Sequence, residues 1–267
     1  MHMAKKNEKY AIKDPATGSV VSMDYASSDE QSAREELLSS FHDSPIPDHS
    51  ILANLGLHLT SKTFSRLIFM NEFYKMGLDV MGQVFDFGTR WGHNMAIFIA
   101  CRGMYEPFNR HRKIIGFDTF GGFPTVITPE DGQSEMIDVG NISVTENYKT
   151  YLETHLGFLE KDNSLPHLKK FELKQGDASK TIQTYFTENP HALVSHAFFD
   201  FDLYKPTRDC LETVWDRAPR GAVFGFDELN DEDSPGETQA LMEILPISSI
   251  KLQKFPWVSR VSYFVKE

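Results

Sequence analysis

The segment that decides the fold spans residues 83–92 and reads QVFDFGTRWG. Residues 83–87 have the short apolar pattern of a buried strand, and Gly88 and Gly92 give the backbone the freedom to turn sharply after it. An apolar stretch over residues 94–104 follows and is typical of a helix. A strand, a glycine turn and a helix in this order predict one unit of a parallel α/β sheet.

The same alternation of strands and helices continues toward the C-terminus. The last two expected strands, at 250–255 and 258–265, are separated by a link that contains Pro256. Because this link is too short for a crossover, the two strands should form an antiparallel hairpin. The other expected elements are strands at 113–117, 171–174, 192–201 and 221–226, and helices at 144–159, 178–187, 207–217 and 238–245. We therefore predict a doubly wound α/β fold with a seven-stranded, mostly parallel sheet.

Residues 1–58 are predicted to form an N-terminal arm ahead of a domain that spans residues 59–267. The arm is polar, and a capped helix is expected to begin near Ser28, where acids precede apolar residues. The domain should open with a second helix, capped by Thr60 or Ser61. The sequence therefore predicts one α/β domain with a helical extension.

The composition excludes several classes of function. The chain has 27 Lys and Arg against 38 Asp and Glu, a net charge of −11, which argues against nucleic-acid and anionic-membrane binding. Its longest apolar stretches are far below the roughly 20 residues that span a bilayer. The start of the chain does not have the pattern of a signal peptide. Cys101 and Cys210 are too few for a disulfide framework or a zinc site. We expect a soluble cytoplasmic protein.

Acidic residues follow almost every strand of the predicted sheet. The carboxyl ends of parallel strands meet at one edge of a sheet, which is where ligands bind in such folds. Carboxylates gathered there repel one another unless a cation or hydrogen-bond donors join them. The acids in question are Asp86, Asp118, Asp177, Asp200, Asp202, Asp227 and Glu228. Their clustering predicts a binding site for a positively charged ligand.

The turn after the first strand favours S-adenosyl-L-methionine over a dinucleotide. It lacks the G-x-G-x-x-G pattern of pyrophosphate binding, and Asp86 disfavours a phosphate. S-adenosylmethionine carries an ammonium and a sulfonium group and no phosphate. Asp118 is placed to accept the ribose hydroxyls. Asp177 is a candidate for the adenine amino group or for a helix N-cap, and the two roles are compatible.

Four acids at the ends of two neighbouring strands are candidates for a metal site. Asp200 and Asp202 share a face of their strand, and Asp227 follows 27 residues after Asp200, at the end of the next strand. Together with Glu228 they offer oxygen donors that suit Mg²⁺ or another hard divalent cation. The alternative is a set of solvated acids at strand ends. His155 and His196 are expected to be structural.

Several of these segments together resemble the macrocin O-methyltransferase family of S-adenosylmethionine-dependent enzymes. The branch with the most similarity methylates sugars of enediyne antibiotics such as calicheamicin. The segments are IGFDTF at 115–120, FDFDLYKPT at 199–207, FDEL at 226–229 and PGE at 235–237, and the resemblance covers about residues 59–245. It implies the class I, Rossmann-like methyltransferase fold.

The resemblance also assigns roles to individual residues. It implies a metal site of Asp200, Asp227 and Glu228, although the family usually has Asp at the last position. We take Asp200 and Asp202 as the candidate catalytic residues. The implied cofactor-binding residues are Asp86, Gly88, Thr89, Gly92, Asn94, Asp118, Thr119, Asp177, Ala178 and Asp200.

Residues 119–143 have no clear period and are rich in glycine and proline, so we expect a lid or binding loop there. Some family members carry a histidine in the lid as a candidate base, but this lid has none between Gly121 and Ser143. Asp202 or Asp138 is the alternative base. The family further implies a homo-oligomer in which N-terminal segments help to form the neighbouring active site.

Our hypothesis is therefore a metal-assisted O-methyltransferase that acts on a sugar hydroxyl of a natural product or nucleotide sugar. A catechol-type O-methyltransferase uses similar acids at a similar spacing and is one alternative. A nucleotide-binding module without catalysis is another. An iron hydroxylase is disfavoured because no two-histidine-one-carboxylate site stands at these strand ends. A nicotinamide dehydrogenase is disfavoured because the dinucleotide fingerprint is missing.

Overall fold

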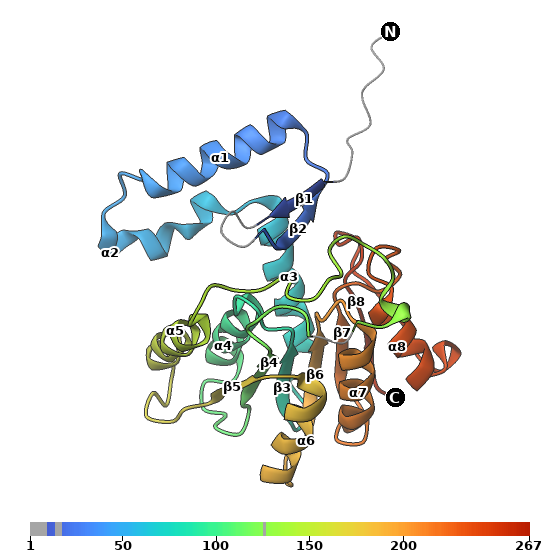
Figure 1. The fold of residues 1–267 in the computed structure, drawn as a ribbon. Helices are drawn as coiled ribbons and strands as arrows, with labels where there is room; N and C mark the ends of the chain where they lie inside the picture. Colours follow the sequence, from blue (N-terminus) through green and yellow to red (C-terminus); the bar gives the residue numbers. More distant parts are fainter. Residues whose placement is uncertain (1–9, 14–17, 125–126) are drawn as a thin grey trace.

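The fold is described here from a computed structural model, which defines residues 10–13, 18–124 and 127–267. Its centre is a six-stranded sheet in the order β5-β4-β3-β6-β7-β8 (Figure 1). β8 runs antiparallel to β7, and the other neighbours are parallel. The strands are β3 (Gln83–Phe87), β4 (Ile114–Asp118), β5 (Phe171–Gln175), β6 (Val194–Phe199), β7 (Val223–Phe226) and β8 (Ser262–Val265). The predicted α/β fold with a mostly parallel sheet is confirmed.

Helices cover both faces of this sheet. Side chains alternate along each strand, so Phe85 and Phe87 face α6, α7 and α8, whereas Val84 faces α3, α4 and α5. Each face thereby forms its own apolar core. The helices are α3 (Ser61–Met76), α4 (His93–Tyr105), α5 (Tyr148–Asp162), α6 (Ala178–Glu188), α7 (Tyr204–Trp215) and α8 (Gly236–Ile244). They lie within a few residues of the predicted ranges.

Four phenylalanines near the strand ends align the carboxyl edge of the sheet. Phe87 stacks on Phe117 and Phe199 at ring distances of 5.0 and 4.8 Å, and Phe199 stacks on Phe226 at 4.9 Å. These residues also pair across the parallel ladder. Each buried ring contributes roughly 1.5–3 kcal/mol. The stacked rings keep the carboxyl ends of the four strands aligned, so the acids that follow the strands lie at one edge of the sheet.

The C-terminal hairpin is shorter than the sequence predicts. Residues 250–255 contribute one isolated bridge, at Gln253, instead of a strand. Pro256 has no N–H to continue a ladder. Phe255 packs against Phe69 at a ring distance of 5.6 Å. The predicted count of seven strands is therefore wrong, since the described residues form six in the central sheet.

The N-terminal arm contains an antiparallel hairpin that the sequence analysis does not predict. Its predicted helix is present and is capped by Ser27, through a capping box with Glu30, and not by Ser28. The arm consists of β1 (Tyr10–Lys13), β2 (Val20–Asp24), α1 (Ser28–His42), α2 (Asp48–Ile51) and the 3-10 helix η1 (Leu52–His58). The boundary between arm and domain at residue 58 stays a prediction, and residues 1–9 and 14–17 lie outside the described part.

The hairpin of the arm is joined to the loop after β4. The Val20 amide donates to Asn141 Oδ1 at 3.0 Å, and the Val20 carbonyl accepts from the Ile142 amide at 2.9 Å. The arm thus lies above the carboxyl edge of the sheet (Figure 1). This contact places β2 beside the acids described below.

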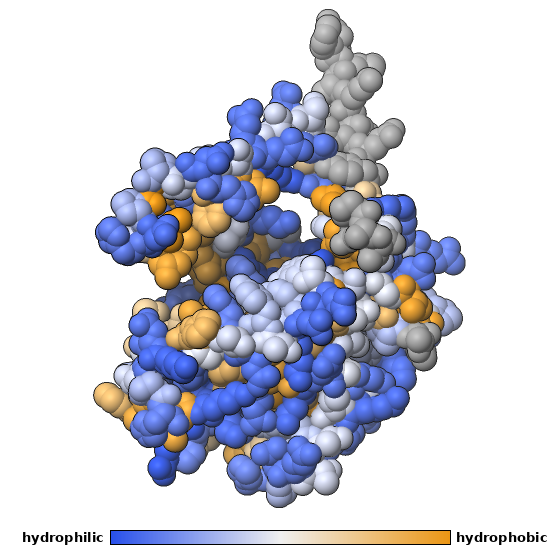
Figure 2. Space-filling model, turned by 60° about the vertical axis from the view of Figure 1, so that its left-hand side comes forward, coloured by the Kyte–Doolittle hydropathy of each residue, from blue (hydrophilic) through white to orange (hydrophobic). Residues whose placement is uncertain are grey.

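The helices of the arm contribute little to the core of this chain. None of the residues in α1, α2 and η1 is buried. Apolar side chains gather on the surface of the arm (Figure 2), among them Leu38, Leu52 and Leu57, which are 57, 78 and 69 % exposed. That the arm helps to form a neighbouring site in a homo-oligomer stays a prediction. Among the described residues, no helix has the length and apolar character needed to cross a membrane.

Candidate active site

A cavity of about 610 Å³ opens at the carboxyl edge of the parallel strands. Small-molecule sites commonly have volumes of roughly 300–1,000 Å³. The wall is built from the first residues after β3, β4, β5, β6 and β7, the start of α3, strand β2 and residues 257–261. The cavity therefore lies where the topology of the sheet predicts a ligand.

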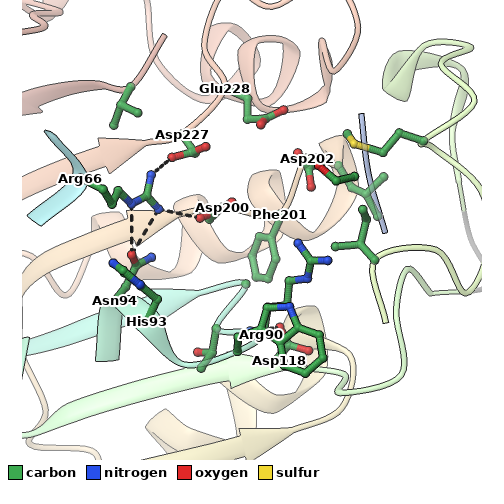
Figure 3. A pocket seen from close by; sticks show the side chains of 18 of the residues that line it. Arg66, Arg90, His93, Asn94, Asp118, Asp200, Phe201, Asp202, Asp227 and Glu228 are labelled. Carbon is green, nitrogen blue, oxygen red and sulfur yellow. Dashed lines mark hydrogen bonds and ion pairs between the residues drawn. The ribbon is translucent and has the colours of Figure 1, made fainter. Parts of the chain in front are cut away.

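The Arg66 guanidinium joins the ends of two strands inside this cavity (Figure 3). Its Nη2 donates to Asp200 Oδ2 at 2.8 Å, and its Nη1 donates to Asp227 Oδ1. Its Nε and Nη2 both reach Asn94 Oδ1, at 3.3 and 3.2 Å. Burial opposes the charged form, but Asp227 and Asp200 outweigh it, so the pKa of Arg66 is raised above its ordinary value. Arg66 is the counter-ion of this acid pair.

A second group of acids lies beside the first. Glu228 forms an ion pair with Arg260, and its Oε2 is buried without a hydrogen-bond partner among the described residues. Burial raises the pKa of Asp202 to about 7 and that of Glu228 to about 10, and the repulsion from Asp202 adds to the latter shift. Both shifts favour the uncharged forms of these buried carboxyl groups. Asp202 has a φ of 60°, the left-handed region.

The turn after β3 leaves few N–H groups for a phosphate. The Gly88 amide donates to the Phe117 carbonyl at 2.9 Å, and the Arg90 amide donates to Asp118 Oδ2 at 2.7 Å. The Gly92 amide bonds within the turn, at 2.7 Å. Gly88 has a φ of 83°, and a Cβ there would lie 1.9 Å from the Asp200 carbonyl oxygen. The backbone of the turn therefore packs tightly against its neighbours, and its amides are not free to bind a pyrophosphate.

Comparisons with solved structures place this fold among known enzymes. The crystal structure of CalS11, a calicheamicin methyltransferase, superposes with a TM-score of 0.87 and 33 % identity, over 90 % of this chain and 93 % of that one. The apo structure of CalS11, described as a TDP-rhamnose 3'-O-methyltransferase, gives a TM-score of 0.79 and 31 % identity, over 90 % and 95 %. The chain belongs to the calicheamicin-type sugar O-methyltransferase family. The resemblance noted in the sequence is thereby confirmed.

Other comparisons add less to this family assignment. The O-methyltransferase NovP superposes with a TM-score of 0.54 at 17 % identity, over 75 % of this chain and 79 % of that one, and this likeness concerns the fold. A comparison with protein-family models and one with curated proteins find no match.

Most of the cofactor-binding residues predicted for this sugar O-methyltransferase line the cavity. Two do not. Asp86 is fully buried behind the wall, and Gly92 packs against Leu152, whose Cδ1 would lie 2.3 Å from an added Cβ. The residues that line the cavity are Gly88, Thr89, Asn94, Asp118, Thr119, Asp177, Ala178 and Asp200. Their roles toward a cofactor stay predictions.

Asp86 acts on the cavity through another residue. Its Oδ1 accepts a hydrogen bond from Asn94 Nδ2 at 3.1 Å, and Asn94 in turn accepts from Arg66. Its Oδ2 has no hydrogen-bond partner among the described residues. Burial raises the pKa of Asp86 to about 6. In this structure Asp86 is linked to the cavity through Asn94 and Arg66, and its role toward a cofactor stays a prediction.

The carboxylates that line this cavity fit the predicted cofactor. Asp118 accepts one backbone hydrogen bond on each oxygen, from Arg90 and Phe120, at 2.7 and 2.6 Å, and each oxygen keeps a further lone pair. Asp177 caps α6 by accepting from the Ser179 amide at 3.0 Å, as the N-cap interpretation predicts. Two fixed acceptors and a turn closed to phosphate suit a ligand with hydroxyl and amino groups and a positive charge.

The predicted metal set fits a divalent ion poorly. The Arg66 guanidinium lies between Asp200 and Asp227, where an ion shared by them would have to sit. Glu228 forms an ion pair with Arg260, which also lies 3.7 Å from Asp227. Within the described ranges, no group of three or more His, Cys, Asp or Glu side chains is arranged to hold a metal ion. We therefore derive no step of the reaction through a metal.

Two buried acids hold the strand-end loops in place. Glu237, fully buried on α8, accepts from the Phe201 amide at 2.9 Å and from the Glu228 amide at 3.3 Å. Asp131, in the loop after β4, accepts from the Tyr204 amide at 2.5 Å. The sequence analysis did not assign Asp131 to the site. Asp138, a predicted alternative base, is exposed and does not line the cavity.

The sequence analysis also missed the arginines of the cavity. Arg66 lies on α3, before the first strand of the sheet, and Arg260 lies just before β8. Arg90 follows the glycine turn, and its Nη2 donates to the Val21 carbonyl at 2.7 Å, which ties β2 to the domain. Arg66 is 134 residues from Asp200 in sequence, so no local spacing points to their pairing.

Proposed function

We propose that this chain transfers the methyl group of S-adenosylmethionine to a hydroxyl group of a sugar. The observation that carries the proposal is the acid-lined cavity, which has fixed carboxylates at Asp118 and Asp177 and no phosphate-binding turn, in a member of a sugar O-methyltransferase family. When bound, S-adenosylmethionine supplies the electrophilic methyl group on its sulfonium.

The residues around the cavity would orient the two substrates. We assign Asp118 to the ribose hydroxyls and Asp177 to the adenine amino group, since both acids follow neighbouring strands β4 and β5. Thr89 and Thr119 add hydroxyl groups to the same part of the wall. Because methyl transfer needs an in-line arrangement of acceptor and donor, positioning by rigid strand ends accounts for much of the rate enhancement.

The sugar hydroxyl must lose its proton as the new bond forms. Asp200 and Asp202 both line the cavity, but Asp200 is bonded to Arg66. Among the described residues, no Lys, Arg or His forms an ion pair with Asp202. We therefore assign proton removal to Asp202 and a positioning role to Asp200, with the positive charge of Arg66 nearby to stabilise developing negative charge.

The acceptor that we favour is a sugar nucleotide. CalS11 is described as acting on TDP-rhamnose. In this chain, Lys62 and Arg90 line the cavity, and Arg90 Nε has no hydrogen-bond partner among the described residues. Cationic side chains at the cavity wall suit the oxygen atoms of a diphosphate. Localisation in the cytoplasm would suit such an acceptor and stays a prediction.

Isothermal titration calorimetry with S-adenosylmethionine tests the cofactor, with nicotinamide adenine dinucleotide as the comparison. We expect binding of the first and none of the second. Absence of both heat and a thermal shift at millimolar S-adenosylmethionine would overturn the proposal. Acceptor screening with sugar nucleotides, glycosides and catechols then tests the acceptor class, and methylation of catechols alone would favour the catechol-type alternative.

A further inference from the structure

The contacts of Arg66 lead to an inference about the cation requirement of this site. We propose that Arg66 is the resident cation of the Asp200–Asp227 pair, and that it takes the place of a divalent ion. Methyl transfer by this chain then needs no divalent metal. The part of this inference that concerns catalysis rests on the proposed function, whereas the part that concerns cation binding does not.

The Arg66 guanidinium lies between the Asp200 and Asp227 carboxylates and contacts both of them. It presents two nitrogens to two carboxylates and shares a third acceptor, Asn94 Oδ1, at 3.2–3.3 Å. A planar fork of N–H donors matches carboxylate oxygens in direction as well as charge. The acceptors come from α4 and from the loops after β6 and β7, so Arg66 joins three parts of the wall.

The guanidinium is held in this position by more than its two acids. It lies 5.0 Å from the centre of the Phe198 ring, which supports the cation from the side of the sheet. Its helix is anchored one turn later by Phe69, which is fully buried. Asn94 is fixed by the buried Asp86. A divalent ion would have to displace a cation that is already held by three acceptors and an aromatic ring at the cavity wall.

The third predicted ligand is engaged elsewhere. Glu228 pairs with Arg260, which also contacts Asp231 at 2.9 Å. Its second oxygen, Oε2, is buried and has no hydrogen-bond partner among the described residues. Arg260 also reaches Asp227, since its Nη2 lies 3.7 Å from Asp227 Oδ2, so both guanidinium groups compensate the acids of this edge. An ion bound by all three predicted ligands would have to displace both guanidinium groups.

Electron paramagnetic resonance of Mn²⁺ measures whether the acid pair binds a divalent cation, with Mn²⁺ as the probe. Wild-type protein should leave Mn²⁺ free in solution at micromolar concentrations. Arg66→Met should bind one Mn²⁺ about tenfold more tightly than wild type, since no resident cation competes. Arg208→Met is the matched control, because Arg208 also contacts two acids, Asp209 and Glu243, but lies outside the cavity. It should behave as wild type.

Stoichiometric binding of Mn²⁺ by the wild-type protein at micromolar concentrations would overturn the inference. A folded Arg66→Met variant that binds no Mn²⁺ would also overturn it, because the acid pair would then not be a latent cation site. If that variant does not fold, Arg66→Lys replaces it and should keep Mn²⁺ out as wild type does. Where methyl transfer is detected, its rate should be unchanged by a chelator, and loss of activity that Mg²⁺ restores would contradict the inference. The Mn²⁺ measurement stands even if no methyl transfer is found.

Discussion

The Glu237 carboxylate accepts a hydrogen bond from the backbone amide of Phe201 at 2.9 Å. Because its other oxygen accepts from the Glu228 amide, one buried side chain on α8 fixes the backbone after β6 and after β7. The acids of the cavity are carried on these two loops. Their mutual placement therefore depends on a residue that does not itself line the cavity.

Replacing Glu237 by Ala should destabilise the protein and weaken the site. The change leaves two backbone N–H groups without acceptors in a buried region, at a cost of about 2–4 kcal/mol in the free energy of unfolding. Urea denaturation measures this effect. Glu243→Ala on the same helix is the control, since Glu243 is exposed and its loss should cost less than about 1 kcal/mol. Equal stabilities of the two variants would contradict the clamp role of Glu237.

Substitution at Gly88 tests the closed turn after β3. Gly88→Ala introduces a Cβ at 1.9 Å from a backbone oxygen, with a φ of 83°. The unfolding free energy should fall by at least about 3 kcal/mol, and cofactor binding should be lost. Gly157→Ala is the matched control in α5, where no atom lies within 4 Å of an added Cβ, and it should stabilise the helix by roughly 0.5–1 kcal/mol. A Gly88→Ala protein as stable as wild type would disprove the packing described for this turn.

Because His196 is buried, we expect the free energy of unfolding to decrease as the pH is lowered. Its ring nitrogens contact Ser195 Oγ and the Tyr74 carbonyl, each at 2.9 Å. Burial lowers the pKa of His196 to about 3, with the Arg112 charge as a second cause. The unfolded chain has a histidine pKa of about 6.5. Between these two values the unfolded state binds the proton and the folded state does not, so stability decreases as the pH falls.

The size of this effect follows from the width of the pH window. From pH 6.5 to pH 5, His196 should account for a loss of about 2 kcal/mol in unfolding free energy. Urea denaturation across this range should show a shallower slope for His196→Gln than for wild type. His155→Gln, at an exposed position of α5, should keep the wild-type slope. Parallel slopes for all three proteins would show that His196 does not contribute.

Asp118 should determine cofactor affinity. Asp118→Ala removes both carboxylate oxygens that we assign to the ribose hydroxyls. Hydrogen bonds to a charged group contribute about 1.5–3 kcal/mol, so the Kd for S-adenosylmethionine should rise about 10- to 100-fold. Calorimetry measures the Kd, and Asp162→Ala, exposed at the end of α5, is the control. An unchanged Kd in folded Asp118→Ala would remove Asp118 from the cofactor site.

The sequence predicts the parallel core well because its signals are local. The strand, glycine turn and helix around Gly88 can be recognised within about 20 residues. The meeting of Asp200 and Asp227 at one edge follows from parallel topology. In the structure their loops are level, because Phe199 and Phe226 pair across the ladder.

The features that sequence reasoning misses depend on contacts between distant segments. Arg66 reaches Asp200 and Asp227 from a helix that precedes the sheet, and nothing in its local sequence marks it. The hairpin of the arm has short strands, and the Val20 amide on its edge donates a hydrogen bond to Asn141 in the loop after β4. The metal prediction counts acids at strand ends but cannot include the arginine that pairs with them.

Mass spectrometry of the reaction products tests the central claim most directly. The full-length protein is incubated with S-adenosylmethionine bearing a deuterated methyl group and with a panel of sugar nucleotides. The claim predicts a sugar product that carries all three deuteriums, together with S-adenosylhomocysteine in equal amount, and the loss of both when Asp202 is replaced by Asn. Bound S-adenosylmethionine without any labelled sugar product across the panel would contradict it.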